Sequence, residues 1–171
     1  MSETGQPLGA NKIIGALKRA GIHFVVSLPD RTTSRYLLEA MIRDPDLRVV
    51  QVCKEDEGLS ICSGLYCAGQ RALLLIQHTG LLDSINALCS VAVEGQNPVC
   101  IMAGLLLKEP GVAPTQSKRY GVRIVEPILD AMGIEHHLVE DSEDINKIVP
   151  AIDGAYARSG PVVLLIGREP E

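Results

Sequence analysis

The sequence alternates short, uninterrupted apolar runs with segments whose apolar residues recur every three or four positions, as they do on one face of a helix. The runs lie at residues 23–29, 48–53, 72–77, 98–105, 136–140 and 161–167. Strands that are apolar along their whole length are buried on both faces, which is typical of a parallel sheet with helices on each side. We therefore expect a doubly wound α/β domain built on a mostly parallel, six-stranded sheet.

The chain is long enough for one such domain and apolar enough to bury a core. It has 171 residues, of which 46% are hydrophobic but only 3% are aromatic. The core must therefore be built from aliphatic side chains. We expect residues 1–10, which are polar and small, to form a flexible N-terminus, and residues 11–171 to form a single domain.

Charge and hydropathy argue against two classes of partner. The net charge is -5 and the basic residues form no run, which argues against a nucleic-acid-binding protein. No apolar run is long enough to span a membrane and the N-terminus is unlike a signal peptide, so we expect a cytoplasmic protein. The five cysteines, odd in number and without a Cys-x-x-Cys pair, predict buried free thiols and argue against a zinc site.

Three segments with polar residues follow predicted strands. They are residues 27–33 (SLPDRTT), 54–58 (KEDEG) and 77–83 (QHTGLLD). In open α/β sheets, ligands bind in the crevice outside the carboxyl ends of the strands. We therefore expect these three loops to carry the functional site.

Four stretches of the chain resemble the pyrimidine-binding (PYR) domain of thiamine-diphosphate-dependent decarboxylases. They are SLPDRTTSRYLLEAM (27–41), EDEGLSICSGLYCAG (55–69), LIQHTGLLDSINALCSV (75–91) and PTQSKRYGVRIVEPILDAMGI (114–134). Within that family, the resemblance is strongest to the sulfopyruvate and phosphonopyruvate decarboxylases. It extends over nearly the whole chain, from about residue 11 to residue 167.

The resemblance implies a catalytic and cofactor-binding role for Glu57, which precedes Gly58 in the matched Glu-Gly pair. In the family, this glutamate hydrogen-bonds the aminopyrimidine ring of thiamine diphosphate and favours the tautomer that takes a proton from the thiazolium C2. A partly buried carboxylate has a raised pKa and can share a proton with a ring nitrogen. Two alternatives stay open: the acids at 55–57 only complement a helix N-terminus, or Glu55 has the role instead.

The resemblance also implies roles for residues after the third strand. His78 occupies the family position that faces the reacting centre, where it would contact the substrate or stabilise developing negative charge. A histidine that is simply hydrogen-bonded in its loop is an equally good interpretation. Thr79 and Gly80 are candidates for contacts with the cofactor, and so is Asp83, although the family usually has Asn at that position.

Two further segments carry candidate substrate-binding residues. Arg31 stands where the family usually has serine near the substrate carboxylate, and a guanidinium suits bidentate binding of a carboxylate, sulfonate or phosphonate. Gln116, Lys118 and Arg119 lie in a polar loop, residues 108–121, that we expect to be mobile and to cover an anionic substrate. Solvent-exposed surface charges are the alternative for both segments. We expect no metal ligand on this chain.

In the family, the diphosphate and Mg2+ bind to a second domain that has a Gly-Asp-Gly motif, and this sequence contains no such motif. The resemblance therefore implies the alpha subunit of a two-chain enzyme, whose beta subunit binds the Mg2+ and the diphosphate of thiamine diphosphate. We expect a dimer or a higher hetero-oligomer.

The function that this resemblance implies is a carboxy-lyase that decarboxylates a small anionic 2-oxo acid, such as sulfopyruvate or phosphonopyruvate, and is active only with its partner. Two alternatives stay open. One is a subunit of an acetolactate-synthase-like carboligase, and the other is a non-catalytic regulatory or scaffolding domain with the same fold.

Overall fold

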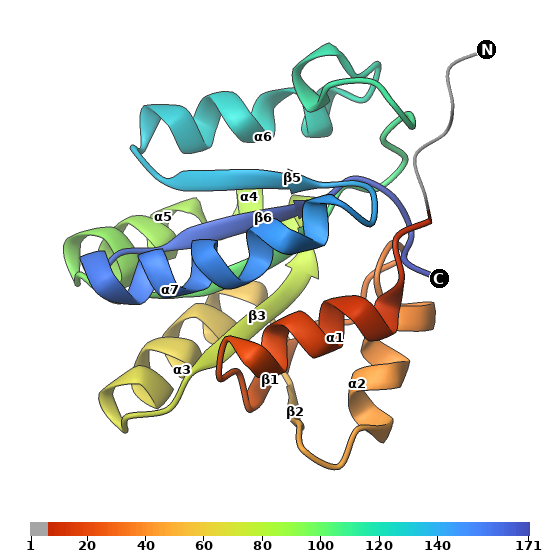
Figure 1. Cartoon of the computed structure of the whole chain (residues 1–171). Helices are drawn as coiled ribbons and strands as arrows, with labels where there is room; N and C mark the ends of the chain where they lie inside the picture. The colour runs from red at the N-terminus through yellow and green to blue at the C-terminus, as the bar shows by residue number, and fades with distance from the viewer. Residues whose placement is uncertain (1–6) are drawn as a thin grey trace.

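A computed structural model describes residues 7–171 and contains the six-stranded sheet that the sequence predicts. All neighbouring strands are parallel, and their order across the sheet is β2-β1-β3-β4-β6-β5. Figure 1 shows the sheet between two layers of helices. The strands are β1 (Phe24–Ser27), β2 (Arg48–Gln51), β3 (Ala72–Gln77), β4 (Cys100–Gly104), β5 (Glu135–Val139) and β6 (Val162–Ile166).

Helical segments connect the strands and cover both faces of the sheet. The α-helices are α1 (Ala10–Arg19), α2 (Glu39–Arg43), α3 (Glu55–Cys67), α4 (His78–Asp83), α5 (Ile85–Ala87), α6 (Tyr120–Ala131) and α7 (Ile148–Arg158). Two wider turns, η1 (Ser34–Leu38) and η2 (Leu88–Glu94), are π-helical, and η3 (Pro114–Gln116) and η4 (Asp144–Lys147) are 3-10 helices. The alternation of strand and helix is that of a doubly wound α/β fold.

The strands divide the core into two aliphatic clusters, because alternate residues of a strand point to opposite faces of the sheet. Val25, Leu73 and Leu75 pack with α1, α2 and α7 on one face. Val26 and Leu74 pack with α3, α4 and α6 on the other. The core is therefore aliphatic, as the composition predicts.

Several details differ from the sequence-based expectations. β2 lies at the edge of the sheet and is mostly exposed, because a strand has a neighbour on only one side there. α3 begins at Glu55, so residues 55–58, which we expected in a loop, belong to the helix and the acids at 55–57 form its first turn. Residues 78–83, which we expected to form a loop, fold into the short helix α4.

The Asp30 side chain stabilises the turn between β1 and the helical segment η1, which itself begins at Ser34 without a side-chain cap. The Asp30 carboxylate accepts hydrogen bonds from the Thr33 N–H (2.8 Å) and the Thr33 hydroxyl (2.6 Å). The Ser34 hydroxyl in turn accepts a hydrogen bond from the Asp30 N–H (2.7 Å). An aspartate that accepts hydrogen bonds from N–H groups two and three residues further on is a common stabiliser of such turns.

The predicted flexible N-terminus, residues 1–10, falls partly outside the described residues, which begin at Pro7. Leu8 is fully buried, and residues 8–10 exchange backbone hydrogen bonds of 2.8 Å with Glu171. The cysteines are free, but only Cys62 and Cys100 are buried, whereas the prediction placed every thiol in the core. Within residues 7–171, no helix is long and apolar enough to cross a membrane.

Candidate functional site

The segments that follow β1, β3 and β4 meet at one edge of the sheet because these strands are parallel neighbours. Ser27 of β1 is paired with Leu75 of β3, and Gln77 at the end of β3 is paired with Gly104 at the end of β4. The loop after β1 packs closely on Gly104, where a Cβ atom would lie 2.8 Å from the Thr32 Cβ. We call this side of the sheet the carboxyl edge, and it is where an α/β fold places its ligand.

The carboxylate of Glu57 is used to cap its own helix. Its Oε2 accepts hydrogen bonds from the backbone N–H groups of Cys53 (3.1 Å) and Lys54 (3.2 Å), which is a capping-box arrangement. The residue is exposed, which differs from the partly buried carboxylate that the sequence suggested. The Glu57 carboxylate therefore accepts hydrogen bonds from backbone N–H groups at the start of α3. Its role toward a cofactor stays a prediction.

The side chain of Glu55 points in a different direction, onto the first turn of α4. It fills the space beside the α-carbon of Gly80, so that any Cβ atom on residue 80 would collide with its carboxylate. Glu55 is half-buried and Gly80 is buried. Of the two candidate glutamates, Glu55 is therefore the one that lies against a predicted cofactor-binding residue.

Gly58 serves the packing of α3 against the sheet. A Cβ atom at this position would collide with Leu74 of β3 and lie 3.5 Å from Val26 of β1. Gly58 therefore allows close helix–sheet contact, which fixes the height of the first turn of α3 above the sheet.

Other polar residues of α4 lie close to the same turn. Thr79 is exposed, and its hydroxyl accepts a hydrogen bond from the Gln77 amide (2.7 Å). Asp83 is exposed and lies close enough to Lys54 to help raise the pKa of that lysine, although the hydrogen bond from Lys54 to Asp56 is the larger cause. The structure thus brings together Glu55, Thr79, Gly80 and Asp83 on the side of the sheet that α3 and α4 cover.

His78 faces away from this group, into the protein. It is 4% exposed, and its Nδ1 lies 3.2 Å from both the Gly104 carbonyl oxygen and the Leu106 backbone nitrogen. On the other side of the ring, a Cβ atom on Gly121 would lie 3.1 Å from the His78 Nε2. Burial lowers the pKa of His78, against the opposing effect of its hydrogen bond with Gly104. Its ring joins the end of β4 to the start of α6, and its predicted contact with substrate stays a prediction.

Arg31 lines an open cleft of about 550 Å³ outside the ends of β1 and β2. The residue is exposed. Arg35 shares the cleft and stacks on Tyr36, with its guanidinium carbon 5.1 Å from the ring centroid. The acidic residues Asp30, Glu39 and Glu169 also line this cleft. The lining therefore holds three acidic and two basic residues, and the predicted contact of Arg31 with an anionic substrate stays a prediction.

Gln116 ends the short helix η3 in the segment between β4 and α6, and its side chain is exposed, like those of Lys118 and Arg119. The segment is tied down by side chains that the sequence analysis did not single out. Lys108 and Glu140 form an ion pair, and Glu109 accepts a hydrogen bond from the Ser117 hydroxyl. A signal for the ion pair was present, because Lys108 and Glu140 are the first charged residues after two apolar strands.

The geometry defines a class of protein: a doubly wound α/β chain, whose carboxyl edge is where such folds bind their ligands. Glu55 and the residues of α4 offer a carboxylate, a hydroxyl and a close approach to the backbone, which suit the ring of a cofactor. The described residues contain no group of three or more side chains that could hold a metal ion.

Comparisons with known proteins identify the family. No family model matches the chain. The chain is 30% identical over 160 residues to the sulfopyruvate decarboxylase subunit alpha of Methanocaldococcus jannaschii, covering 92% of both chains. It is 28% identical to the sulfopyruvate decarboxylase of Methanosarcina acetivorans and 24% identical to the phosphonopyruvate decarboxylase of Streptomyces viridochromogenes. These matches cover 91% and 80% of this chain, but only 39% and 34% of those longer proteins.

This chain belongs to the family of sulfopyruvate decarboxylase alpha subunits. It aligns with the alpha subunit almost from end to end, whereas it corresponds to little more than a third of the longer proteins. The regions of those proteins that it does not match are the size of at least one further domain.

Proposed function

We propose that this chain is the alpha subunit of a thiamine-diphosphate-dependent decarboxylase that acts on a small, acidic 2-oxo acid such as sulfopyruvate or phosphonopyruvate. The main observation in support of the proposal is the end-to-end similarity to an alpha subunit. A second observation is that the Glu55 carboxylate lies against α4 at the carboxyl edge of the sheet. Thiamine diphosphate supplies an electron sink for the loss of CO2 from a 2-oxo acid.

Glu55 is the residue that we assign to proton transfer. Its carboxylate is free of the helix-capping bonds that engage Glu57, and it lies on Gly80, which the resemblance places at the cofactor. A carboxylate in that place would hold a proton shared with a ring nitrogen and so control the charge of the ring. Glu57 is the alternative, and it would have to leave its cap to take this role.

Arg31 is the residue that we assign to the acidic group of the substrate. It is exposed at the cleft outside β1 and β2, and Arg35 adds a second positive charge to the same cleft. A sulfonate or phosphonate offers several oxygens that a guanidinium fork can bind in pairs. The cationic residues Lys118 and Arg119 lie on a separate segment and are further candidates for attracting an anion.

The partner that we propose is a beta subunit that carries a Gly-Asp-Gly motif and holds Mg2+ and the diphosphate. The chain should release no CO2 on its own, because its sequence lacks the Gly-Asp-Gly motif that binds the diphosphate and Mg2+ in the family. The experiment mixes the purified chain with thiamine diphosphate, Mg2+ and a candidate beta subunit, and measures CO2 release from sulfopyruvate, phosphonopyruvate and pyruvate. Release only from the mixture, with the acidic substrates preferred, is the expected result. Turnover by the isolated chain, or none by any mixture, would contradict the proposal.

A further inference from the structure

The segment between β4 and α6 is held at both ends by one residue. At its start, the His78 Nδ1 lies 3.2 Å from the Gly104 oxygen and from the Leu106 nitrogen. At its end, Gly121 approaches the His78 Nε2 so closely that a Cβ atom would be 3.1 Å away. The segment therefore leaves the sheet and returns to it at fixed points, which shortens the chain that is free to move.

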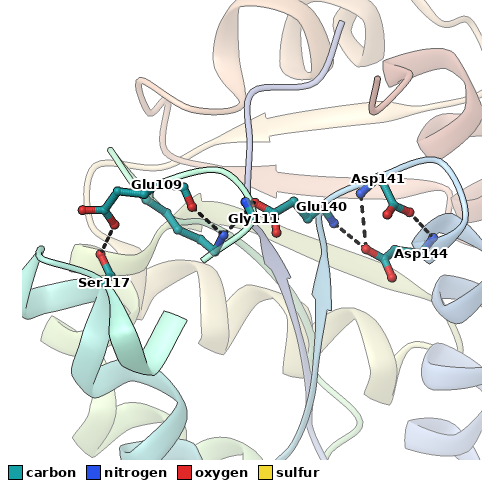
Figure 2. Close-up of polar contacts among 7 residues, drawn as sticks. Glu109, Gly111, Ser117, Glu140, Asp141 and Asp144 are labelled. Atoms are coloured by element: carbon teal, nitrogen blue, oxygen red, sulfur yellow. Dashed lines mark hydrogen bonds and ion pairs between the residues drawn. The ribbon is translucent and has the colours of Figure 1, made fainter. Parts of the chain in front are cut away.

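A buried ion pair anchors the segment to the neighbouring loop after β5. The Lys108 Nζ lies 2.6 Å from the Glu140 Oε1, and the two side chains are 0% and 17% exposed. Lys108 also donates to the Glu109 carbonyl oxygen (3.0 Å), and the Gly111 N–H donates to the same Glu140 oxygen (3.2 Å). Figure 2 shows this row of contacts running from Ser117 to Asp144.

Glu140 itself is fixed from two sides. Its backbone N–H donates to the Asp144 carboxylate (2.8 Å), which also accepts a hydrogen bond from the Asp141 N–H (3.2 Å). Gly167, just after β6, has no side chain, and a Cβ atom there would lie 3.1 Å from the Glu140 Cβ. The anchor point for Lys108 is therefore part of the framework formed by the ends of β5 and β6.

A second set of hydrogen bonds connects the start of this segment to its end. The Glu109 carboxylate accepts hydrogen bonds from the Ser117 hydroxyl (2.7 Å) and from the Lys118 N–H (3.2 Å). Ser117 is 1% exposed. Lys108 and Glu109 are adjacent, so the Lys108–Glu140 ion pair and the hydrogen bonds of Glu109 hold the same turn. Together they define the path of residues 109–118.

Backbone strain next to the anchor agrees with this arrangement. Leu107 has a φ of 60° and is 60% exposed, although left-handed backbone is unfavourable for a residue other than glycine. Such strain persists only where the surrounding structure fixes the chain, and it is common at functional sites. Here the His78 contacts precede Leu107 and the Lys108 ion pair follows it.

We infer that the Lys108–Glu140 ion pair is a positioning element of the site, which fixes residues 109–119 in advance so that Gln116, Lys118 and Arg119 form a preformed wall for an anionic substrate. This inference rests on the proposed function. A buried ion pair can often be replaced by apolar residues without loss of stability, so its presence favours a role in selecting one geometry. The segment is then a wall that exists before binding and not a lid that orders on binding.

The experiment compares a double variant with a matched control. Lys108→Met combined with Glu140→Leu removes both charges without leaving either one buried and unpaired, so the chain should still fold. Glu135→Gln is the control, because Glu135 begins the same strand β5 and forms a 2.7 Å ion pair with Arg158 at the opposite edge of the sheet. Glu140→Gln alone is a second variant, in which Gly111 keeps a side-chain acceptor but Lys108 loses its charged partner.

Hydrogen exchange in the isolated chain is the first measurement. We expect the double variant to speed exchange of the Gly111 amide at least tenfold, because its acceptor is lost. The Lys118 amide should speed by a similar factor, although its own acceptor, Glu109, is unchanged. Glu135→Gln should leave both amides as in the wild type. An unchanged Lys118 amide in the double variant would overturn the inference, since the pair would then not fix the segment.

Kinetics of the assembled enzyme is the second measurement. We expect the double variant to raise KM for the acidic 2-oxo acid at least fivefold with kcat within twofold, and to change KM for pyruvate less. Glu140→Gln should shift KM in the same direction. Faster exchange with an unchanged KM would overturn the positioning role. If the wild-type assembly releases no CO2, the proposed function fails, and the exchange data still decide whether the pair fixes the segment.

Discussion

At the β2–β1–β3 half of the carboxyl edge, charged side chains remain open to solvent, whereas at the β4–β6–β5 half the main charged pair is buried. Arg31, Glu57 and Asp83 are exposed in the first half. In the second half, Lys108 and Glu140 are 0% and 17% exposed and bonded to each other. Charged groups of the first kind are free to bind a ligand. Charged groups of the second kind already form ion pairs and hydrogen bonds that stabilise the fold.

We expect substitutions in the β2–β1–β3 half, which we call the open half, to change function more than stability. Arg31→Ala should lower kcat/KM for an acidic 2-oxo acid at least tenfold through KM, because a charge-assisted contact is worth about 1.5–3 kcal/mol. Arg43→Ala, which removes an exposed arginine paired with Glu39 at 3.3 Å, is the control and should have wild-type kinetics. Steady-state assays of the assembled enzyme measure both, and equal kinetics for Arg31→Ala and wild type would make Arg31 an ordinary surface residue.

We expect a smaller effect from a substitution at Gly80, in the open half of the carboxyl edge. Gly80→Ala places a Cβ atom where the Glu55 carboxylate now lies, so the carboxylate must move. Because a flexible side chain can shift cheaply, we expect a loss of at most about 1 kcal/mol in stability but a drop of about tenfold in kcat. Gly15→Ala, inside α1 on the other face, is the matched control. If Glu57 is the functional carboxylate, Gly80→Ala should instead retain full activity.

The smallest effect concerns the pH dependence of His78, which follows β3 and contacts the segment after β4. Burial holds the pKa of His78 below its ordinary value of 6.5, so the unfolded chain binds the proton more readily than the folded chain does. The stability that neutral His78 contributes is therefore present above pH 6.5 and is lost as the pH falls below it toward the folded pKa.

Urea unfolding between pH 8 and pH 5 tests this dependence, with His78→Gln as the comparison and His23→Gln, at an exposed position, as the control. We expect the difference in unfolding free energy between wild type and His78→Gln to shrink as the pH falls. A difference that stays constant over this range would contradict the account of His78 as a buried, neutral link between β4 and α6.

The sequence was sufficient for the elements and for the class of sheet. Uninterrupted apolar runs such as 72–77 and 161–167 are buried strands in the structure. Edge positions were less predictable, since the apolar residues of β2 do not reveal that the strand has only one neighbour. Strand order depends on contacts between distant segments, which local patterns do not specify.

The sequence predicted that the segments after β1 and β3 lie at the same edge of the sheet, but it did not predict the orientation of their side chains. The Glu-Gly pair drew attention to Glu57, yet Gly58 serves helix–sheet packing and Glu57 caps α3. Periodicity cannot show that Glu55, two residues earlier, lies against Gly80 from a different helix. Long-range pairs such as Lys108 and Glu140 were missed for the same reason, because each is an isolated charge in the sequence.

We propose that Glu55, and not Glu57, is the carboxylate that this chain contributes to the reaction. The measurement is hydrogen–deuterium exchange at C2 of thiamine diphosphate bound to the assembled enzyme, for Glu55→Gln and Glu57→Gln side by side. We predict that Glu55→Gln slows exchange by about 10²–10⁴, the usual contribution of a positioned acid–base group. Glu57→Gln should keep exchange near wild type and lose at most about 1 kcal/mol of stability with its helix cap. Normal exchange in Glu55→Gln together with slow exchange in Glu57→Gln would contradict the account.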